Sequence, residues 1–248
     1  MRPPPLDPSS ALFLDVDGTL LEIAARPDLV RVPQGLPALL DRLATERDGA
    51  LALVSGRKLA DLDRLLRPWR GAAAGLHGLD IRRPDGTLLQ RGPACDAEAR
   101  SALDRARPRL QAWAADAPGV LLEDKGWSLA MHYRNAPEHA DEIARLADCL
   151  VHQSGEALCL LPGKMVVELL PHGAGKGGAI AALMAAPPYR GRRPIFLGDD
   201  VTDEHGFAEV NRRGGLAVRV GEAVGQTQAG YRLPSIAAAL DWLAGGAK

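Results

Sequence analysis

Short apolar runs alternate with longer amphipathic stretches in the first part of the chain. Residues 11–16 and 50–54 are runs of the kind that form buried strands, and residues 35–47 and 58–69 carry apolar side chains at helical spacing. The same alternation returns in the last third. The elements expected there are helices at 176–186, 203–211 and 235–244 and strands at 194–198 and 216–220. This order predicts an α/β fold, with a parallel sheet and crossover helices.

The middle of the chain follows a different order. A Pro-Asp-Gly turn within LDIRRPDGTLLQR (79–91) predicts a hairpin. After it, the order helix, strand, strand occurs twice, which is typical of an antiparallel sheet with two helices. The elements expected are helices at 96–116 and 138–153 and strands at 119–123, 127–133, 157–161 and 165–170. The middle is therefore interpreted as an α+β insertion within one α/β domain.

Composition narrows the function classes. The chain has 248 residues, of which 46% are hydrophobic, and a formal net charge of −1, which argues against a general nucleic-acid or membrane surface. Cys95, Cys149 and Cys159 show no CxxC spacing and indicate a reducing compartment. The apolar run at 179–186 is too short to span a membrane, and the N-terminal residues lack a signal-peptide core. We expect a cytoplasmic enzyme or binding protein.

The stretch LFLDVDGTL (12–20) places two carboxylates directly after an apolar run. On a continuing strand, Asp15 and Asp17 would face opposite sides of the sheet. They can act together only if the strand stops, so that Gly18 turns the chain and brings Asp17 back above the carboxyl end of the strand. Ligands of parallel sheets bind at that end. An Asp-rich loop cap is the alternative.

Three further segments place polar groups at the ends or starts of expected core elements. They are VSGR (54–57), GAGKGG (173–178) and GDDVTDE (198–204). Taken singly, each has a plain structural explanation, since Ser55 is a possible helix cap, Lys176 a possible solvated lysine and the acids a possible capping cluster. Their shared position at one sheet edge favours a functional site.

In this order, LDVDGT, VSGR, a lysine and GDDVTDE resemble the haloacid dehalogenase superfamily of phosphoryl-transfer enzymes. The resemblance implies that Asp15 is a nucleophile that forms an aspartyl phosphate. It implies that Asp17 is a general acid and then a base, and that Ser55 and Lys176 hold the phosphoryl oxygens.

A Mg²⁺ site is also implied by this resemblance. Its ligands would be Asp15, the backbone carbonyl of Asp17 and Asp199, with Asp200 and Asp203 in support. The chemistry agrees, because a carboxylate that attacks a phosphate dianion is repelled unless a divalent cation offsets the charge.

Three other stretches resemble trehalose-6-phosphate phosphatases: GLHG (75–78), LEDKGWSLAMHYR (122–134) and PGKMVVEL (162–169). The resemblance covers about residues 11 to 242. It implies a Rossmann-like parallel-sheet core with an inserted α+β cap domain, an antiparallel sheet plus two helices. The implied division is core 1–81, cap 82–165 and core 166–248. It also implies a monomeric enzyme that acts on a small-molecule substrate, trehalose 6-phosphate, with no nucleic-acid or membrane partner.

By the same resemblance, a set of side chains contacts the substrate. These residues are Glu123, Lys125, Arg134, Lys164 and Glu168 in the cap and Gly56, Arg57 and His77 in the core. Lys–Glu pairing on an exposed sheet face is the alternative for the cap residues. His77 is also consistent with a hydrogen-bonded histidine in a turn, and Trp127 with a core aromatic rather than a sugar-stacking one.

Some positions depart from the family pattern. Leu170 and His172 stand where relatives commonly carry basic residues, and Val16 where an aromatic is common. Neither departure touches the proposed catalytic set. Two other function classes stay open, because only the cap residues favour trehalose 6-phosphate. One is a different sugar-phosphate enzyme on this scaffold, such as a sucrose-phosphate or glucosylglycerol-phosphate phosphatase or a phosphomannomutase. The other is a catalytically silent sugar-phosphate sensor.

Overall fold

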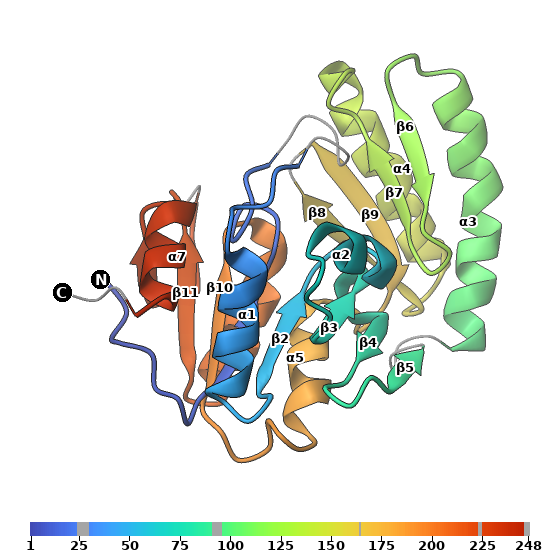
Figure 1. Cartoon of the computed structure of the whole chain (residues 1–248). Helices are drawn as coiled ribbons and strands as arrows, with labels where there is room; N and C mark the ends of the chain where they lie inside the picture. The colour runs from blue at the N-terminus through green and yellow to red at the C-terminus, as the bar shows by residue number, and fades with distance from the viewer. Residues whose placement is uncertain (24–29, 91–95, 164, 223–224, 246–248) are drawn as a thin grey trace. The chain divides into compact units, whose positions relative to one another are not determined.

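A computed structural model describes residues 1–23, 30–90, 96–163, 165–222 and 225–245 (Figure 1). The chain forms two compact units. The first contains residues 1–90 and 175–248, and the second contains residues 91–174. Each is described by itself below.

An eight-stranded sheet forms the centre of the first unit, in the order β12-β11-β10-β1-β2-β3-β4-β5. The strands from β12 to β3 are parallel, and β4 and β5 continue the sheet antiparallel to their neighbours. Their bounds are β1 Ala11–Leu14, β2 Leu51–Val54, β3 Ala72–Gly75, β4 Asp80–Arg82, β5 Leu88–Gln90, β10 Pro194–Gly198, β11 Leu216–Val220 and β12 Tyr231–Leu233.

Helices cover both faces of this sheet. Alternate residues of β1 point to opposite sides, so Leu12 and Leu14 join one apolar core and Phe13 joins the other. The first core includes residues of α1 (Leu36–Thr45), α2 (Leu59–Leu65) and α7 (Ile236–Leu243), and the second includes residues of α5 (Lys176–Met184) and α6 (Glu204–Arg212). The result is a three-layer, doubly wound arrangement, and its parallel sheet with crossover helices is what the alternating pattern predicted.

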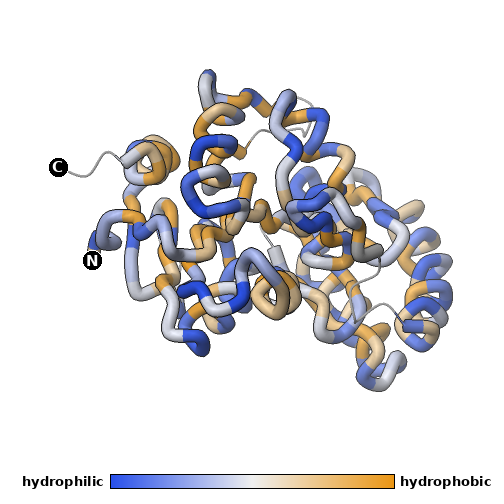
Figure 2. Tube along the Cα trace, turned by 60° about the horizontal axis from the view of Figure 1, so that its bottom comes forward, coloured by the Kyte–Doolittle hydropathy of each residue, from blue (hydrophilic) through white to orange (hydrophobic). Residues whose placement is uncertain are grey.

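The second unit packs two helices on one face of a four-stranded antiparallel sheet. The sheet order is β6-β7-β9-β8, with β6 Leu121–Asp124, β7 Leu129–His132, β8 Leu158–Gly163 and β9 Val166–Pro171. The helices are α3 (Ala97–Ala115) and α4 (Ala140–Gln153). Leu103, Ile143 and Leu169 lie in their shared core. The helices of the tube in Figure 2 contain both hydrophobic and hydrophilic residues, as expected of helices that present one apolar face to a core.

Two features differ from the sequence-based expectations. The Pro-Asp-Gly hairpin forms, but its strand β4 pairs with β3, so the hairpin extends the large sheet of the first unit. The first boundary between the units therefore falls after Gln90, and because β9 (Val166–Pro171) pairs with β7 and β8, the second falls after Ala174; the predicted cap was 82–165. Strand β12 was not predicted, because three residues at a sheet edge carry no measurable periodicity. Three single-turn helices, η2 (Leu76–Gly78), η3 (Pro137–His139) and η4 (Val201–Asp203), complete the elements.

Among the described residues, no helix combines the length and apolar character that crossing a membrane requires. Cys149 and Cys159 are free thiols, and Cys95 lies outside the described residues.

Candidate active site

The carboxyl ends of β1 and β10 lie side by side at the centre of the large sheet. Leu14 is in register with Leu197, and the backbone N–H of Asp15 donates to the Leu197 carbonyl over 2.9 Å. Asp15 therefore follows β1 at the edge where Asp199 follows β10. In doubly wound sheets this edge is where ligands bind.

The chain turns sharply after β1. The carbonyl of Val16 accepts from the N–H groups of Leu20 and Leu21, both over 2.9 Å, so the chain leaves the strand direction after β1. We expected this turn from the spacing of Asp15 and Asp17. Gly18 has a φ of +85°, and a Cβ at this position would lie 2.0 Å from Oδ2 of Asp199. Only glycine therefore allows Asp199 to lie against this turn.

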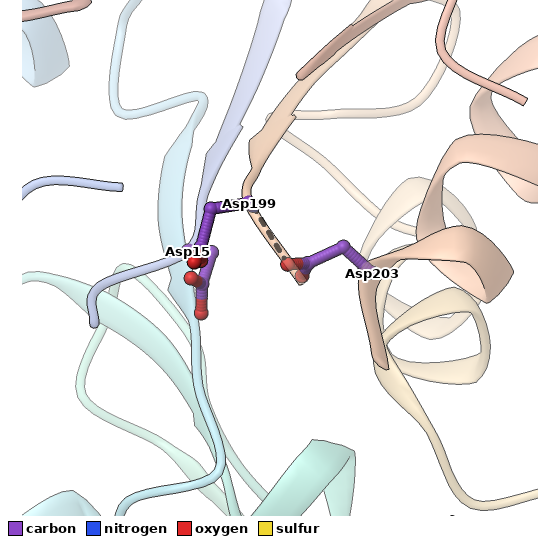
Figure 3. Close-up of side chains that lie close together, drawn as sticks. All are labelled: Asp15, Asp199 and Asp203. Atoms are coloured by element: carbon purple, nitrogen blue, oxygen red, sulfur yellow. Dashed lines mark hydrogen bonds between the residues drawn. The ribbon is translucent and has the colours of Figure 1, made fainter. Parts of the chain in front are cut away.

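Three carboxylates converge at this edge. Asp15, Asp199 and Asp203 each offer one oxygen, and these oxygens lie within 4.8 Å of one another (Figure 3). The hydroxyl of Thr19 lies 3.0 Å from Oδ2 of Asp15 and 3.3 Å from Oδ1 of Asp199. Thr19 was not singled out from the sequence, although it belongs to the LDVDGT motif.

A buried lysine joins two of these acids. The Nζ of Lys176 donates to Oδ1 of Asp15 over 2.7 Å and to Oδ1 of Asp203 over 2.6 Å. Burial alone would lower the pKa of Lys176, but the charges of Asp15 and Asp203 outweigh it and raise the pKa. The lysine is therefore held in its ammonium form, and the solvated-lysine alternative is excluded.

The positive charge of Lys176 does not balance the cluster. Burial raises the pKa of Asp15 well above its ordinary value, and the charges of Asp203 and Asp199 add to the effect of burial, against the opposing charge of Lys176. Burial and then the charge of Asp203 raise the pKa of Asp199 to about 6. The single charge of Lys176 thus offsets only part of the negative charge of the three acids. Carboxylate oxygens are also the donors that Mg²⁺ prefers, so the residues present fit this ion.

Asp203 and Asp200 serve the loop itself. Oδ2 of Asp203 accepts from the backbone N–H groups of Asp199 and Asp200, each over 2.9 Å, and thereby fixes the loop after β10. Asp200 does not belong to the group of converging carboxylates. Its side chain caps η4 through the N–H of Val201 at 2.7 Å. The capping role that the sequence left open is thus filled by Asp200.

Asp17 lies apart from that cluster. Its two carboxylate oxygens accept from Nε and NH2 of Arg57, each over 2.7 Å. Ser55 is buried next to this pair, and its Oγ accepts from the backbone N–H of Arg57 over 3.2 Å. The structure therefore joins two residues for which the sequence predicted separate roles, Asp17 as acid and Arg57 as a substrate contact.

The GLHG turn connects two of the motifs. His77 adopts a left-handed conformation with φ +55°; its N–H donates to the Ser55 carbonyl over 3.0 Å and its carbonyl accepts from the N–H of Gly175 over 2.8 Å. A Cβ on Gly56 would lie 2.6 Å from Nε2 of His77, so the imidazole packs directly on the Gly56 backbone. This strained turn fixes the loop of Ser55 against the start of α5.

Three of the predicted sugar-binding residues of the second unit, Glu123, Lys125 and Glu168, lie in ion pairs. Glu168 accepts from Lys125 Nζ over 3.0 Å, and Glu123 lies 3.1 Å from Nε2 of His132. The hydrogen bond of His132 lowers the pKa of Glu123 against the opposing effect of burial. Arg134 is exposed after β7, and Lys164 lies outside the described residues.

The β6–β7 turn carries two further side chains of interest, Trp127 and Ser128. Trp127 lies under the guanidinium of Arg100, 5.0 Å from its ring centroid, and packs beside the core of the second unit. The core interpretation of Trp127 is thus favoured over sugar stacking. Ser128, which was not predicted, donates to Glu168 over 2.5 Å.

A doubly wound core interrupted by a second α+β unit is also the fold of solved phosphatases of the haloacid dehalogenase superfamily. A phosphatase of this superfamily from Bacteroides thetaiotaomicron has the same fold, with a TM-score of 0.62 and 17% identity over 95% of this chain and 93% of that one. The C-terminal domain of the Candida albicans trehalose-6-phosphate phosphatase is more similar, with a TM-score of 0.81 and 22% identity over 95% and 91% of the two chains.

Sequence comparison gives the family. The trehalose-phosphatase family pattern matches residues 13–236, and the trehalose-6-phosphate phosphatase of Escherichia coli is 46% identical over 241 residues, which are 97% of this chain and 87% of that relative. The chain belongs to the trehalose-phosphatase family.

Proposed function

We propose that the protein hydrolyses trehalose 6-phosphate to trehalose and phosphate through an aspartyl-phosphate intermediate on Asp15. The observation that carries this proposal is the buried cluster of Asp15, Lys176, Asp199 and Asp203 at the carboxyl ends of β1 and β10. The family membership supplies the substrate, since relatives in this family are named for that phosphatase activity.

In the first step, a carboxylate oxygen of Asp15 attacks phosphorus and the sugar alkoxide leaves. The hydrogen bonds of Lys176 and Thr19 to the two Asp15 oxygens keep this carboxylate in one orientation. Asp17 protonates the leaving alkoxide and then removes a proton from the water that hydrolyses the acyl phosphate. Ser55 and Lys176 donate to the phosphoryl oxygens.

Mg²⁺ would be held by Asp15, the backbone carbonyl of Asp17 and Asp199, with Asp200 and Asp203 in support. When bound, such an ion offsets the negative charge of the phosphoryl group and its nucleophile. The excess of carboxylates over Lys176 and the raised pKa values of Asp15 and Asp199 support this assignment. Asp203 contributes through Lys176 and through the loop N–H groups that it fixes.

The second unit would supply the sugar contacts. Carboxylates accept hydrogen bonds from sugar hydroxyls, and ammonium groups donate to these hydroxyls. The sheet of this unit and its β6–β7 turn carry both kinds of group. The residues proposed for this role are Glu123, Lys125, Arg134, Lys164 and Glu168, and Gly56, Arg57 and His77 are proposed to contact the substrate from the first unit.

The proposal is tested by phosphate release with Mg²⁺ from trehalose 6-phosphate, sucrose 6-phosphate, glucose 6-phosphate, mannose 6-phosphate and glucosylglycerol phosphate. Strong preference for the first supports both halves of the proposal. Preference for another sugar phosphate would keep the Asp15 chemistry and overturn the substrate. Binding of trehalose 6-phosphate without turnover by the wild-type protein would favour a sensor. We further propose that the enzyme is a cytoplasmic monomer, which sedimentation and fractionation would check.

A further inference from the structure

The hairpin turn between β6 and β7 brings two polar side chains to one place. Asp124 pairs with Leu129, and the N–H of Lys125 donates to the Ser128 carbonyl over 3.0 Å, so Gly126 and Trp127 form a two-residue loop. Gly126 has a φ of +91°, which suits the first central residue of a type II′ turn. Lys125 and Ser128 thus stand opposite each other and point to the same face of the sheet.

Glu168 lies on that same face. It is in register with Ala130 of β7, which stands two residues after Ser128. Its Oε1 accepts from Ser128 Oγ over 2.5 Å and its Oε2 from Lys125 Nζ over 3.0 Å. One turn therefore supplies a separate donor to each oxygen of a single carboxylate.

The opposite side of the turn is fixed to α3. NH1 of Arg100 donates to the Gly126 carbonyl over 2.9 Å, and its guanidinium covers the Trp127 ring. The Nε of Arg107 donates to Asp124 over 2.6 Å. The donors to Glu168 thus stand on a turn that is also hydrogen-bonded to α3.

This arrangement is costly for stability alone. Ser128 is fully buried, and Glu168 is only 5% exposed. Burial removes the hydration of a carboxylate, and its hydrogen-bond partners compensate for this loss only when their geometry is good. Apolar residues of similar size commonly stabilise such a position as well or better. Two buried polar residues in contact with each other therefore indicate that the orientation of the carboxylate matters.

We propose that Ser128 is a positioning residue that holds the carboxylate of Glu168 in the orientation in which it binds the sugar hydroxyls of the substrate. The inference rests on the proposed function, because Glu168 is a proposed sugar contact. Ser128 itself touches no substrate. It selects one rotamer of a long side chain, and Lys125 from the same turn completes the selection.

The test is the Ser128→Ala variant, assayed on trehalose 6-phosphate and on p-nitrophenyl phosphate, which has no sugar. We expect KM for trehalose 6-phosphate to rise about tenfold, as the loss of a hydrogen bond to a charged group implies, with kcat nearly unchanged. KM for p-nitrophenyl phosphate stays at the wild-type value. The control is Ser154→Ala, which removes another buried hydroxyl of the same unit, one bonded to the backbone of Val151 and Leu158.

A double-mutant cycle shows whether Ser128 acts through Glu168. In the Glu168→Ala background the Ser128→Ala change is expected to have no further effect on KM, because no carboxylate is left to orient. A tenfold rise in both backgrounds would overturn the proposal. So would an equal rise for both substrates, which would give Ser128 a general structural role.

A second variant covers the case in which Ser128→Ala fails to fold. Arg100→Ala removes an exposed side chain that fixes the turn from α3, and Arg105→Ala is its control on the same helix, since Arg105 bonds only to Ser101 in the described contacts. We expect Arg100→Ala to raise KM for trehalose 6-phosphate by less than tenfold and Arg105→Ala to leave it unchanged. No difference between these variants would contradict the positioning role. Absence of turnover in the wild-type protein would instead refute the proposed function.

Discussion

Arg57 and Asp17 form a bidentate ion pair, with both carboxylate oxygens 2.7 Å from guanidinium nitrogens. The hydrogen bonds that Arg57 donates to Asp17 raise the pKa of Arg57 despite its partial burial. A guanidinium that donates to both oxygens fixes the plane of the carboxylate, which a single hydrogen bond does not. Both oxygens of Asp17 accept from Arg57, so the pair orients Asp17 as the base proposed to take a proton from water rather than as the acid.

Replacing Arg57 with alanine is expected to slow the steps in which Asp17 handles a proton. We expect kcat for trehalose 6-phosphate to fall by about tenfold or more, a part of the usual contribution of acid–base catalysis. The first turnover of p-nitrophenyl phosphate, whose leaving group needs no proton, should keep its rate. Rapid mixing that records the first equivalent of nitrophenolate checks this. Arg64→Ala, which removes an exposed ion pair with Asp61, is the control. If the first turnover of p-nitrophenyl phosphate falls as much as kcat for trehalose 6-phosphate, Arg57 acts through its proposed substrate contact and not through Asp17.

The Asp15→Asn variant should separate activity from stability. Turnover is expected to fall by about 10⁴-fold or more, because the nucleophile is gone. The thermal midpoint at pH 7 should be equal or higher, since burial raises the pKa of Asp15 and its charged form therefore opposes folding at neutral pH. Differential scanning calorimetry of both proteins measures the midpoints. A clear decrease would show that the charge of Asp15 stabilises the fold through Lys176.

Lys176 should be required for stability as well as for catalysis. Lys176→Met leaves Asp15 and Asp203 buried without a countercharge, which is expected to lower the free energy of unfolding by about 3 kcal/mol. Urea unfolding measures this difference. The exposed Lys58→Met change at the start of α2 should cost less than about 0.5 kcal/mol. If the two lysine variants unfold alike, the charge balance inferred for the cluster is wrong.

Magnesium binding should weaken in acid. Burial raises the pKa of Asp199 from 3.8 to about 6, so between these values the folded protein binds a proton that the unfolded chain does not. The metal-free protein therefore loses stability as pH rises through this window, and the loss is complete above about 6. Mg²⁺ needs the carboxylate, so the rise in thermal midpoint that Mg²⁺ produces should be larger at pH 7.5 than at pH 5.

The matching variants for this experiment are Asp199→Asn and Asp41→Asn. The first should abolish the effect of Mg²⁺ on the thermal midpoint, and the second, an exposed acid of α1, should leave it unchanged. A chelator should remove both the midpoint shift and the activity, and added Mg²⁺ should restore them. A wild-type shift that does not depend on pH would contradict the role of Asp199.

The sequence predicted that Asp15, Lys176 and Asp199 would lie at one edge of the sheet, because the motifs that carry them adjoin core elements. The apolar runs of β10 and β11 appear at the predicted bounds, and the side chains that follow β1 and β10 had to meet, since parallel strands share a carboxyl edge. Prediction was weaker where a contact depends on side-chain reach. Arg57 and Asp17 lie 40 positions apart. The sequence does not show which of several nearby carboxylates a long, flexible arginine side chain will contact.

Strand pairing limited the prediction of the units. The hairpin of β4 and β5 was expected from its turn residues, but nothing local shows that β4 pairs with β3 rather than with the second sheet. Ser128 was missed for a related reason. A serine after a glycine and a tryptophan is an ordinary turn residue, and its contact with Glu168 depends on the register of β7 with β9.

The pairing of β1 with β10 also has a consequence for the nascent chain. Ribosomes synthesise the protein from the N-terminus, so β1 and Asp15 emerge long before their partners, with Lys176 following 161 positions later and Asp199 later still. Until then β1 can pair only with β2, and Asp15 remains hydrated instead of buried. Closure of the sheet is thus a late, long-range event, which slows folding. A truncated translation product that lacks β10 also lacks Asp199 and Asp203 of the proposed centre, so we expect incomplete chains to be inert.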